Sequence, residues 1–137
     1  MRTFVLLTAF LAVLTATTTI AGAEDDVAAG QAVIRAQEQA FSRDDDAAAH
    51  DFASPSIKSQ FRTPDIFMSM VRNGYAPVYR HRSFEFGEAR LFEGQIYQDV
   101  HIVDADGDAW EALYTLEPQG DGSLKISACV LKKAVTS

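Results

Sequence analysis

The spacing of apolar residues changes once along the chain, from a helical period to the period of a strand. Val27, Ile34 and Phe41 recur every seven residues, which places one apolar stripe on a helix over about residues 25–43. From Tyr75 onward, apolar and polar residues alternate, as is typical of strands with one buried face. Helices first and strands last indicate an α+β fold rather than an alternating α/β sheet.

Two further helices are predicted from residues that begin and end helices. Asp44-Asp45-Asp46 interrupts the first helix and supplies an N-cap for a short helix over 47–52. Thr63-Pro64-Asp65 is typical of a helix start, because threonine caps the first turn and proline suits the first helical position. Asn73-Gly74 ends this third helix, since glycine tolerates a left-handed cap.

The second half of the chain predicts a four-stranded sheet. Short segments that contain glycine or aspartate separate the strands and fit tight turns, so the strands form an antiparallel meander. We expect three helices to pack on one face of a curved sheet and to enclose a cleft. The expected strands are at residues 78–88, 95–103, 109–117 and 123–132.

One face of the second strand carries a candidate catalytic group. Asp99 and His101 are two residues apart and share a face. A carboxylate beside an imidazole raises its basicity, as in a general base, and Tyr97 on the same face can donate to a developing oxyanion. Because Val100 and Ile102 lie on the opposite, aliphatic face, an ordinary polar pair on the solvated or dimer-facing side is the favoured interpretation.

A second candidate site is the cationic segment Tyr79-Arg80-His81-Arg82. At strand spacing, Arg80 and Arg82 share a face and can clamp a carboxylate or phosphate, or they can pair with nearby acids. Aromatic residues of the sheet can line a hydrophobic pocket, although aromatics at strand spacing are more often core. The predicted ligand-binding residues are Tyr79, Arg80, Arg82, Trp110 and Tyr114.

Residues 1–23 have the pattern of an export signal. Arg2 is the only charge before Glu24, an apolar run follows it, and Ala21-Gly22-Ala23 has the small-residue spacing of a cleavage site. The run is about half of the roughly 20 residues that a membrane span needs, so a retained anchor is the weaker interpretation. A buried first helix of a cytosolic protein would not explain the cleavage-like end. We expect a signal peptide over 1–23, one mature domain over 24–137 and a periplasmic destination.

Charge and cysteine content argue against several classes of function. The formal net charge of −7 becomes −8 when Arg2 leaves with the signal, and such an acidic domain is not expected to bind nucleic acid or an anionic membrane. Cys129 is the single cysteine, so no disulfide can form within the chain. A lone thiol in a strand usually packs as a small hydrophobe, and neither a redox nucleophile nor a disulfide between two copies has a supporting motif.

No metal or cofactor site is predicted. The loop Asp104–Asp108 resembles a calcium loop but lacks the later glutamate and the required glycine position. The three histidines lack zinc-binding spacings. The chain also has no glycine-rich phosphate cradle, no nucleophile elbow and no C-x-x-C pair.

Four segments of the chain are distinctive, Ala40-Phe41, Phe52–Ile57, Phe67–Arg80 and Asp121–Ile126. Together they resemble short exported bacterial proteins that are classified as a domain of unknown function within the nuclear-transport-factor-2-like (cystatin-like cone) superfamily. The similarity covers about residues 31–131, and its most specific part is the Met-Val-x-x-Gly-Tyr-x-Pro-Val-Tyr-Arg pattern. This resemblance implies a cone-shaped α+β domain and carries no established activity.

The superfamily includes isomerases, dehydratases, ligand-binding proteins and interaction modules, so the fold alone does not select a function. Leu124 stands where the family often has tryptophan, and His50 where an aromatic is common, and both departures weaken the case for a cavity-lining role at these positions. The preferred hypothesis is a non-catalytic exported domain that binds a small apolar or anionic ligand, or a protein partner, in the cone. The alternative is an isomerase- or dehydratase-type enzyme that uses Asp99 and His101 as the base and Tyr97 or Tyr114 as the donor. A homodimer through the outer sheet face is compatible with either.

Overall fold

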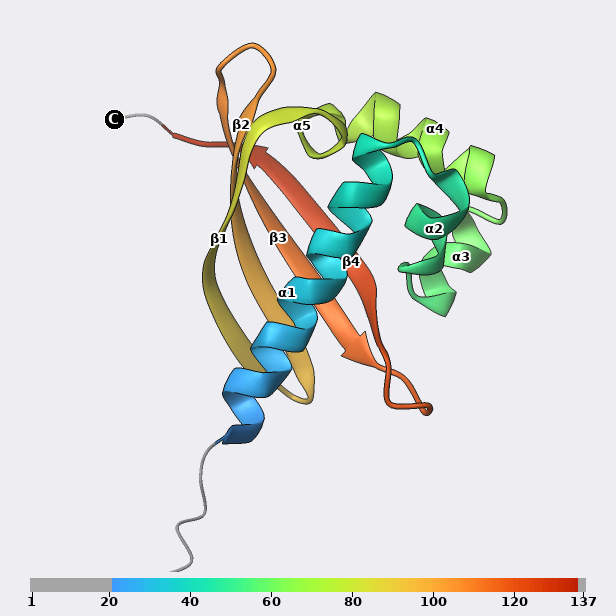
Figure 1. Ribbon diagram of the computed structural model, residues 1–137, viewed down its shortest axis with the longest axis vertical. Coiled ribbons are helices and arrows are strands. Elements are labelled where there is room, and N and C mark those ends of the chain that lie inside the picture. The colour runs from blue at the N-terminus through green and yellow to red at the C-terminus, as the bar shows by residue number, and fades with distance from the viewer. Residues whose placement is uncertain (1–20, 136–137) are drawn as a thin grey trace, which may run out of the picture.

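The computed structural model describes residues 21–135 (Figure 1). Residues 1–20 of the predicted signal peptide lie outside this range. The helices are α1 (Ala21–Ser42), α2 (Asp46–Asp51), α3 (Pro55–Gln60), α4 (Pro64–Gly74) and α5 (Ala76–Tyr79). The strands that follow are β1 (His81–Phe92), β2 (Gln95–Asp104), β3 (Ala109–Pro118) and β4 (Leu124–Lys133).

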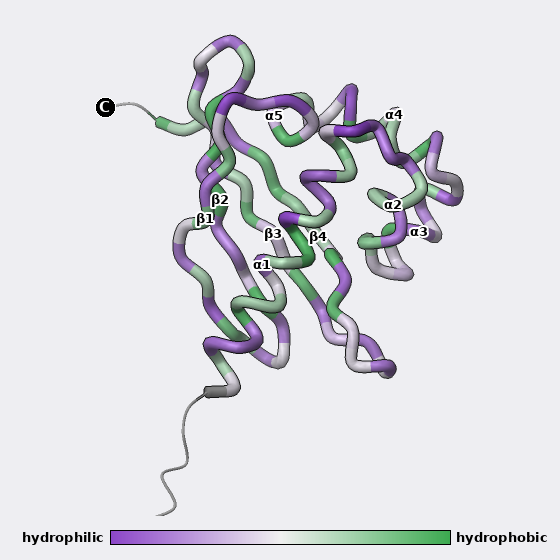
Figure 2. Tube along the Cα trace, viewed as in Figure 1, coloured by the Kyte–Doolittle hydropathy of each residue, from purple (hydrophilic) through white to green (hydrophobic). Residues whose placement is uncertain are grey.

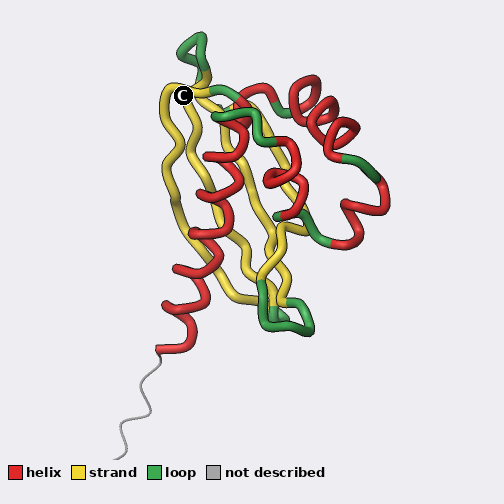
Figure 3. The backbone as a smooth tube through the Cα atoms, turned by 45° about the vertical axis from the view of Figure 1, so that its right-hand side comes forward, coloured by secondary structure: helices red, strands yellow, loops and turns green. Residues whose placement is uncertain are grey.

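The four strands form one antiparallel sheet in the order β1-β2-β3-β4. Helix α1 lies across one face of the sheet, and α2, α3 and α4 lie together on the side of β4 (Figure 1, Figure 3). A parallel bridge between Ala53 and Ile126 ties the segment between α2 and α3 to β4. The fold is therefore α+β, with helices packed on a four-stranded antiparallel meander, as the sequence predicts.

The apolar stripe predicted for α1 is buried in the core. Ile34 is 1% exposed, Phe41 is 2% exposed, and Val27 is partly buried nearer the start of the helix. Hydrophobic and hydrophilic residues also alternate along the strands (Figure 2). Among the described residues, no helix is long and apolar enough to cross a membrane.

Side chains cap three of the helices at their N-terminal ends. Asp45 caps α2, Ser54 caps α3 and Thr63 caps α4, each by accepting a hydrogen bond from the backbone N–H three residues later. The sequence patterns do not predict α3. Ser54 is extended, as expected for a residue before proline, but the helix begins at Pro55 itself, because proline suits the first helical position.

Helix α5 is also an addition to the predicted elements, and it moves the start of β1 from residue 78 to His81. The backbone N–H groups of Tyr79 and Arg80 donate to the carbonyls of Tyr75 and Ala76. These hydrogen bonds close a helical turn that includes the first residues expected in the strand. Residues 81–92 then form a longer β1 than the alternation predicts.

Strand β2 has the two faces that the sequence predicts. Ile96, Val100 and Ile102 are buried, at 3%, 0% and 1% exposure. The side chain of His101 is 55% exposed on the other face. Gln98 lies in the buried row and is fully buried, which the alternation does not predict.

The amide of Gln98 explains this exception. Strand β1 has an irregular register at residues 86–89, and the side-chain nitrogen of Gln98 donates to the carbonyls of Gly87 and Glu88 at 3.1 and 3.3 Å. Its side-chain oxygen accepts a hydrogen bond from Gln31 of α1 at 3.1 Å. The buried amide therefore supplies partners for backbone groups that the bulge removes from the ladder.

Candidate functional site

A cavity of about 340 Å³ lies between the helices and strands β3 and β4. Its volume is at the lower end of the range for small-molecule sites, about 300–1,000 Å³. None of the described residues that line it is charged at neutral pH. The wall is mainly aromatic and aliphatic, and includes Phe41, Ile57, Phe61, Phe67, Val71 and Ile126.

The floor of the cavity includes a tyrosine and the single cysteine. Tyr114 of β3 and Cys129 of β4 are directly opposite in the sheet register, so the phenol and the thiol are neighbours. Burial raises the pKa of the Tyr114 phenol well above its usual range. Burial also raises the pKa of the Cys129 thiol to about 12. Both groups therefore stay protonated and neutral, and Cys129 is not a reactive thiolate.

Three other polar side chains of the wall have partners in the protein. The Tyr75 hydroxyl donates to the carbonyl of Cys129 at 3.0 Å, the Gln37 amide donates to a carbonyl of α2 at 3.1 Å, and the Ser127 hydroxyl donates to the Thr115 carbonyl at 3.3 Å. Within the described residues, no buried side-chain nitrogen or oxygen lacks a partner. These groups hold the wall together and leave a largely apolar surface.

Helix α3 forms an outer part of the wall. It has no fully buried residue, and Ile57 of the helix lines the cavity with the following Phe61. His50 of α2 is hydrogen-bonded through Nε2 to the carbonyl of Phe61 at 2.7 Å. Lys58 pairs with Asp51 on the surface at 3.2 Å. These two contacts join α3 to α2.

Comparison with protein families gives one assignment. A family model described as Domain of unknown function (DUF4864) matches residues 23–137. The chain belongs to this family. Comparisons with curated proteins and with solved structures found no match. The DUF4864 match includes the four strands, the helices from Ala23 onward and the residues that line the cavity, but it assigns no activity to them.

Of the five predicted ligand-binding residues, the DUF4864 domain places Tyr114 in the cavity wall. Trp110 is partly buried against the core, and its indole nitrogen donates to Asp104 at 2.9 Å. Neither His50 nor Leu124 is among the described residues that line the cavity. Most residues of the cavity wall, such as Phe61, Phe67 and Cys129, are not among the predicted ligand-binding residues.

Tyr79 and Arg80 belong to a surface ion-pair cluster rather than to the cavity. The Arg80 guanidinium lies 3.0 Å from a carboxylate oxygen of Asp44 and 3.9 Å from the centre of the Tyr79 ring. It also donates to the Phe41 carbonyl at 2.8 Å. The hydrogen bond from the Tyr79 hydroxyl, followed by the charges of Arg80 and Arg72, lowers the pKa of the Asp44 carboxyl. The alternative interpretation, pairing of Arg80 with the aspartate run, is the one that the structure supports.

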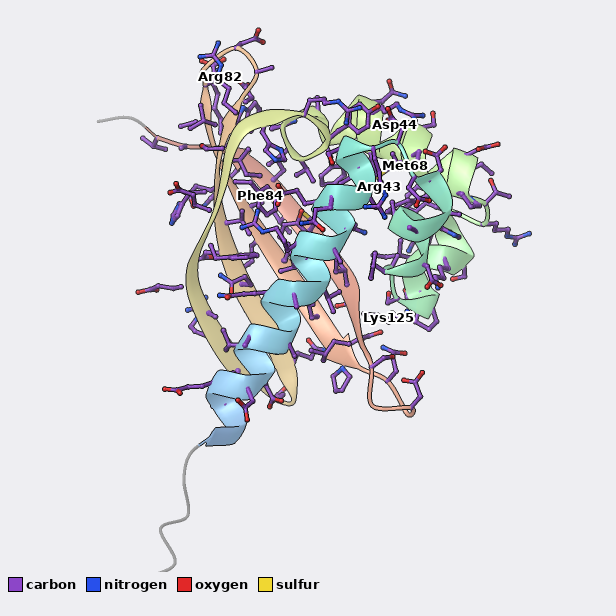
Figure 4. The ribbon with its side chains drawn as sticks, in the orientation of Figure 1. Arg43, Asp44, Met68, Arg82, Phe84 and Lys125 are labelled. Atoms are coloured by element: carbon purple, nitrogen blue, oxygen red, sulfur yellow. The ribbon has the colours of Figure 1, made fainter. Side chains whose placement is uncertain are left out.

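Arg82 lies apart from Arg80, so the predicted guanidinium clamp does not form. A Cβ on Gly107 would lie 3.3 Å from a nitrogen of Arg82, which places this side chain beside the β2–β3 turn. Asp44, the partner of Arg80, lies just after the C-terminal end of α1 (Figure 4). The register shift between His81 and Ser83 breaks the simple alternation on which the clamp depends.

The three predicted catalytic residues lie outside the cavity. The His101 imidazole is 2.8 Å from a carboxylate oxygen of Glu111 on the neighbouring strand. The Tyr97 hydroxyl donates to Gln95 at 3.0 Å, and neither Asp99 nor His101 lines the cavity. These side chains lie on the face of β2 opposite the buried Val100 and Ile102, so the structure does not bring the alternative catalytic set into the cavity. The partner of His101 in the structure is Glu111 rather than Asp99.

The loop Asp104–Asp108 is a turn with internal hydrogen bonds. One Asp104 carboxylate oxygen accepts from the backbone N–H groups of Asp106 and Asp108 at 3.0 and 2.8 Å. The other accepts from Trp110. These donors use both carboxylate oxygens of Asp104, and the described residues contain no group of three or more potential metal ligands.

Proposed function

We propose that this domain is a binding protein for a small, neutral and mainly apolar molecule, which occupies the cavity between the helices and the sheet. The observation that carries the proposal is the cavity itself, about 340 Å³ in volume and lined largely by aromatic and aliphatic side chains. Concave, mainly apolar sites with a few polar groups are the usual form of a small-molecule site.

The charge of the lining favours a neutral ligand over an anionic one. No described residue of the cavity wall provides a cation, and an unpaired charge is costly to bury. Arg80, the strongest candidate to bind an anionic ligand, is already paired with Asp44. The anionic-ligand version of the sequence hypothesis is therefore the weaker one.

Binding is also favoured over catalysis. The described residues of the wall include no histidine or carboxylate, and the two neutral groups on the floor, Tyr114 and Cys129, are far from the pKa that a general base needs near neutral pH. The acid–base enzyme therefore has no support from the cavity lining.

Export and membership of the nuclear-transport-factor-2-like superfamily remain part of the proposal. The family match begins at residue 23, at the end of the predicted signal peptide, and helices packed on an antiparallel meander agree with a cone-like domain. Expression of the full chain, fractionation of the cells and mass spectrometry of the N-terminus test the first point. A cleaved periplasmic protein that starts at Glu24 is expected, and an uncleaved cytosolic protein would contradict it.

The binding proposal is tested with residues 24–137 and the neutral fluorescent probe N-phenyl-1-naphthylamine. We expect a saturable rise in fluorescence for the wild-type domain. Val71→Phe adds volume inside the cavity, where Val71 is 4% exposed, and Val130→Phe makes the same change at a residue that is 60% exposed. The first variant should lose probe binding and the second should keep it. No saturable binding by the wild type, or equal binding by both folded variants, would overturn the proposal.

A further inference from the structure

The Tyr114 hydroxyl has a fixed position at the floor of the cavity. Its ring packs edge-on against Phe84, with ring centres 6.3 Å apart and an interplanar angle of 68°. The residue is 2% exposed. Because a phenolic oxygen lies on the axis of its ring, this packing sets the place of the oxygen and leaves only its proton free to rotate.

The present neighbour of this hydroxyl is a weak acceptor. Cys129 is directly opposite Tyr114 in the sheet register and its thiol lies beside the phenol, and sulfur is a poor hydrogen-bond acceptor compared with oxygen. By contrast, the hydroxyls of Tyr75 and Ser127 donate to backbone carbonyl oxygens. Among these side chains of the wall, Tyr114 therefore has the most to gain from an oxygen acceptor on a ligand.

We infer that the ligand carries a neutral oxygen acceptor, such as a carbonyl, ether or hydroxyl oxygen, on a compact hydrocarbon body, and that the Tyr114 hydroxyl donates to it. This inference rests on the proposed function. A carboxylate would accept the same hydrogen bond, but its charge would be buried without a cation. The acceptor is therefore neutral.

The protonation of Tyr114 agrees with a donor role. Burial raises the pKa of this phenol, so the proton remains on the oxygen through the physiological pH range. The thiol, whose pKa is about 12, keeps its own proton and can still lie beside the ligand oxygen. No proton is transferred in this step, and the ligand is bound rather than converted.

Two probes with nearly the same body separate the hydrogen bond from apolar binding. Ethylbenzene has no oxygen, and acetophenone has a ketone at the equivalent carbon. Their dissociation constants are measured by ligand-observed NMR with wild type, Tyr114→Phe and the control Tyr75→Phe, which removes a hydroxyl already bonded to the Cys129 carbonyl.

We expect both probes to bind the wild-type domain. Tyr114→Phe should weaken acetophenone by about 2- to 12-fold, the fold-change of one net hydrogen bond, and leave ethylbenzene within about twofold. Tyr75→Phe should change the two probes equally. Binding of both probes with equal effects of Tyr114→Phe would overturn the inference and leave the proposed function intact. Binding of neither probe would overturn the proposed function.

A second measurement does not depend on the variant being folded. The infrared carbonyl band of acetophenone shifts to lower wavenumber when its oxygen accepts a hydrogen bond. In the wild-type complex we expect this band below its position in hexane. A band at the hexane position would show that the bound ketone accepts no hydrogen bond, and the inference would fail.

Discussion

Gln98→Leu tests whether one buried amide stabilises the bulge in β1. The Gln98 nitrogen donates to the carbonyls of Gly87 and Asp99 at 3.1 and 2.7 Å. Its oxygen accepts from Gln31 at 3.1 Å. Leucine is similar in size but makes none of these hydrogen bonds, so the substitution removes the partners while it keeps most of the packing.

The magnitude depends on how far water can replace the lost amide. A buried polar group left without a partner costs about 1–3 kcal/mol. Gln31 is partly exposed, so its side chain can turn to water, whereas the carbonyls that face the fully buried Gln98 cannot all do so. We therefore expect the free energy of unfolding to fall by about 2–3 kcal/mol.

Urea unfolding of residues 24–137, followed by circular dichroism, measures this change. Gln39→Leu is the matched control, because Gln39 is exposed on α1, and it should change the free energy by less than about 0.5 kcal/mol. If the slope of the unfolding free energy against urea concentration (the m-value) is the same for variant and wild type, the substitution has changed stability alone. If Gln98→Leu were as stable as the control, the role given to the amide would be refuted.

Three further predictions concern a carboxylate, a thiol and the core. The pKa of Asp44 is lowered in the folded state, first by the hydrogen bond from the Tyr79 hydroxyl. The contribution of this carboxylate to stability is therefore present above the ordinary aspartate pKa and is lost as pH falls below about 4. Asp44→Asn should flatten the fall in melting temperature in that range, and a variant with the wild-type pH profile would contradict this. Cys129 is partly buried and the pKa of its thiol is about 12, so it should react with a disulfide reagent at pH 8 much more slowly in the folded domain than in urea, and equal rates would contradict this. Met68 is 0% exposed, so Met68→Ala should lower the free energy of unfolding by about 2–5 kcal/mol. Ile66 is 51% exposed, so Ile66→Ala should lower it much less. Urea unfolding compares the two variants, and equal losses would contradict the burial of Met68 in the core.

The fold could be predicted because its main signals are local. The seven-residue recurrence that includes Ile34 and Phe41 predicts the buried stripe of α1, and the alternation in β2 predicts the buried Val100 and the exposed His101. The sequence also contains a signal for α3, since Ser54-Pro55 has the same cap-then-proline order as Thr63-Pro64.

The site could not be predicted to the same extent, because it depends on distant segments. The cavity brings together residues from α1, α3, α4, β3 and β4, and no spacing along the chain encodes the gap between them. Tyr114, one of the residues proposed from the strand pattern, does line the cavity. The clamp by Arg80 and Arg82, one of the two interpretations that the sequence left open, does not form because helix α5 and the register shift after His81 separate two residues that simple alternation places together.

The distribution of polar contacts is consistent with a cavity that is formed before a ligand arrives. On the outside, Asp44 joins the end of α1 to Arg72 of α4 and to Arg80 after α5, at 3.7 and 3.0 Å. On the inside, the Tyr75 hydroxyl joins the end of α4 to β4 through the Cys129 carbonyl. Each surface ion pair contributes little by itself, but contacts on both sides of α4 define the distance between this helix and the sheet. A site held open in this way needs less ordering when a ligand binds, so more of the apolar contact energy appears as affinity.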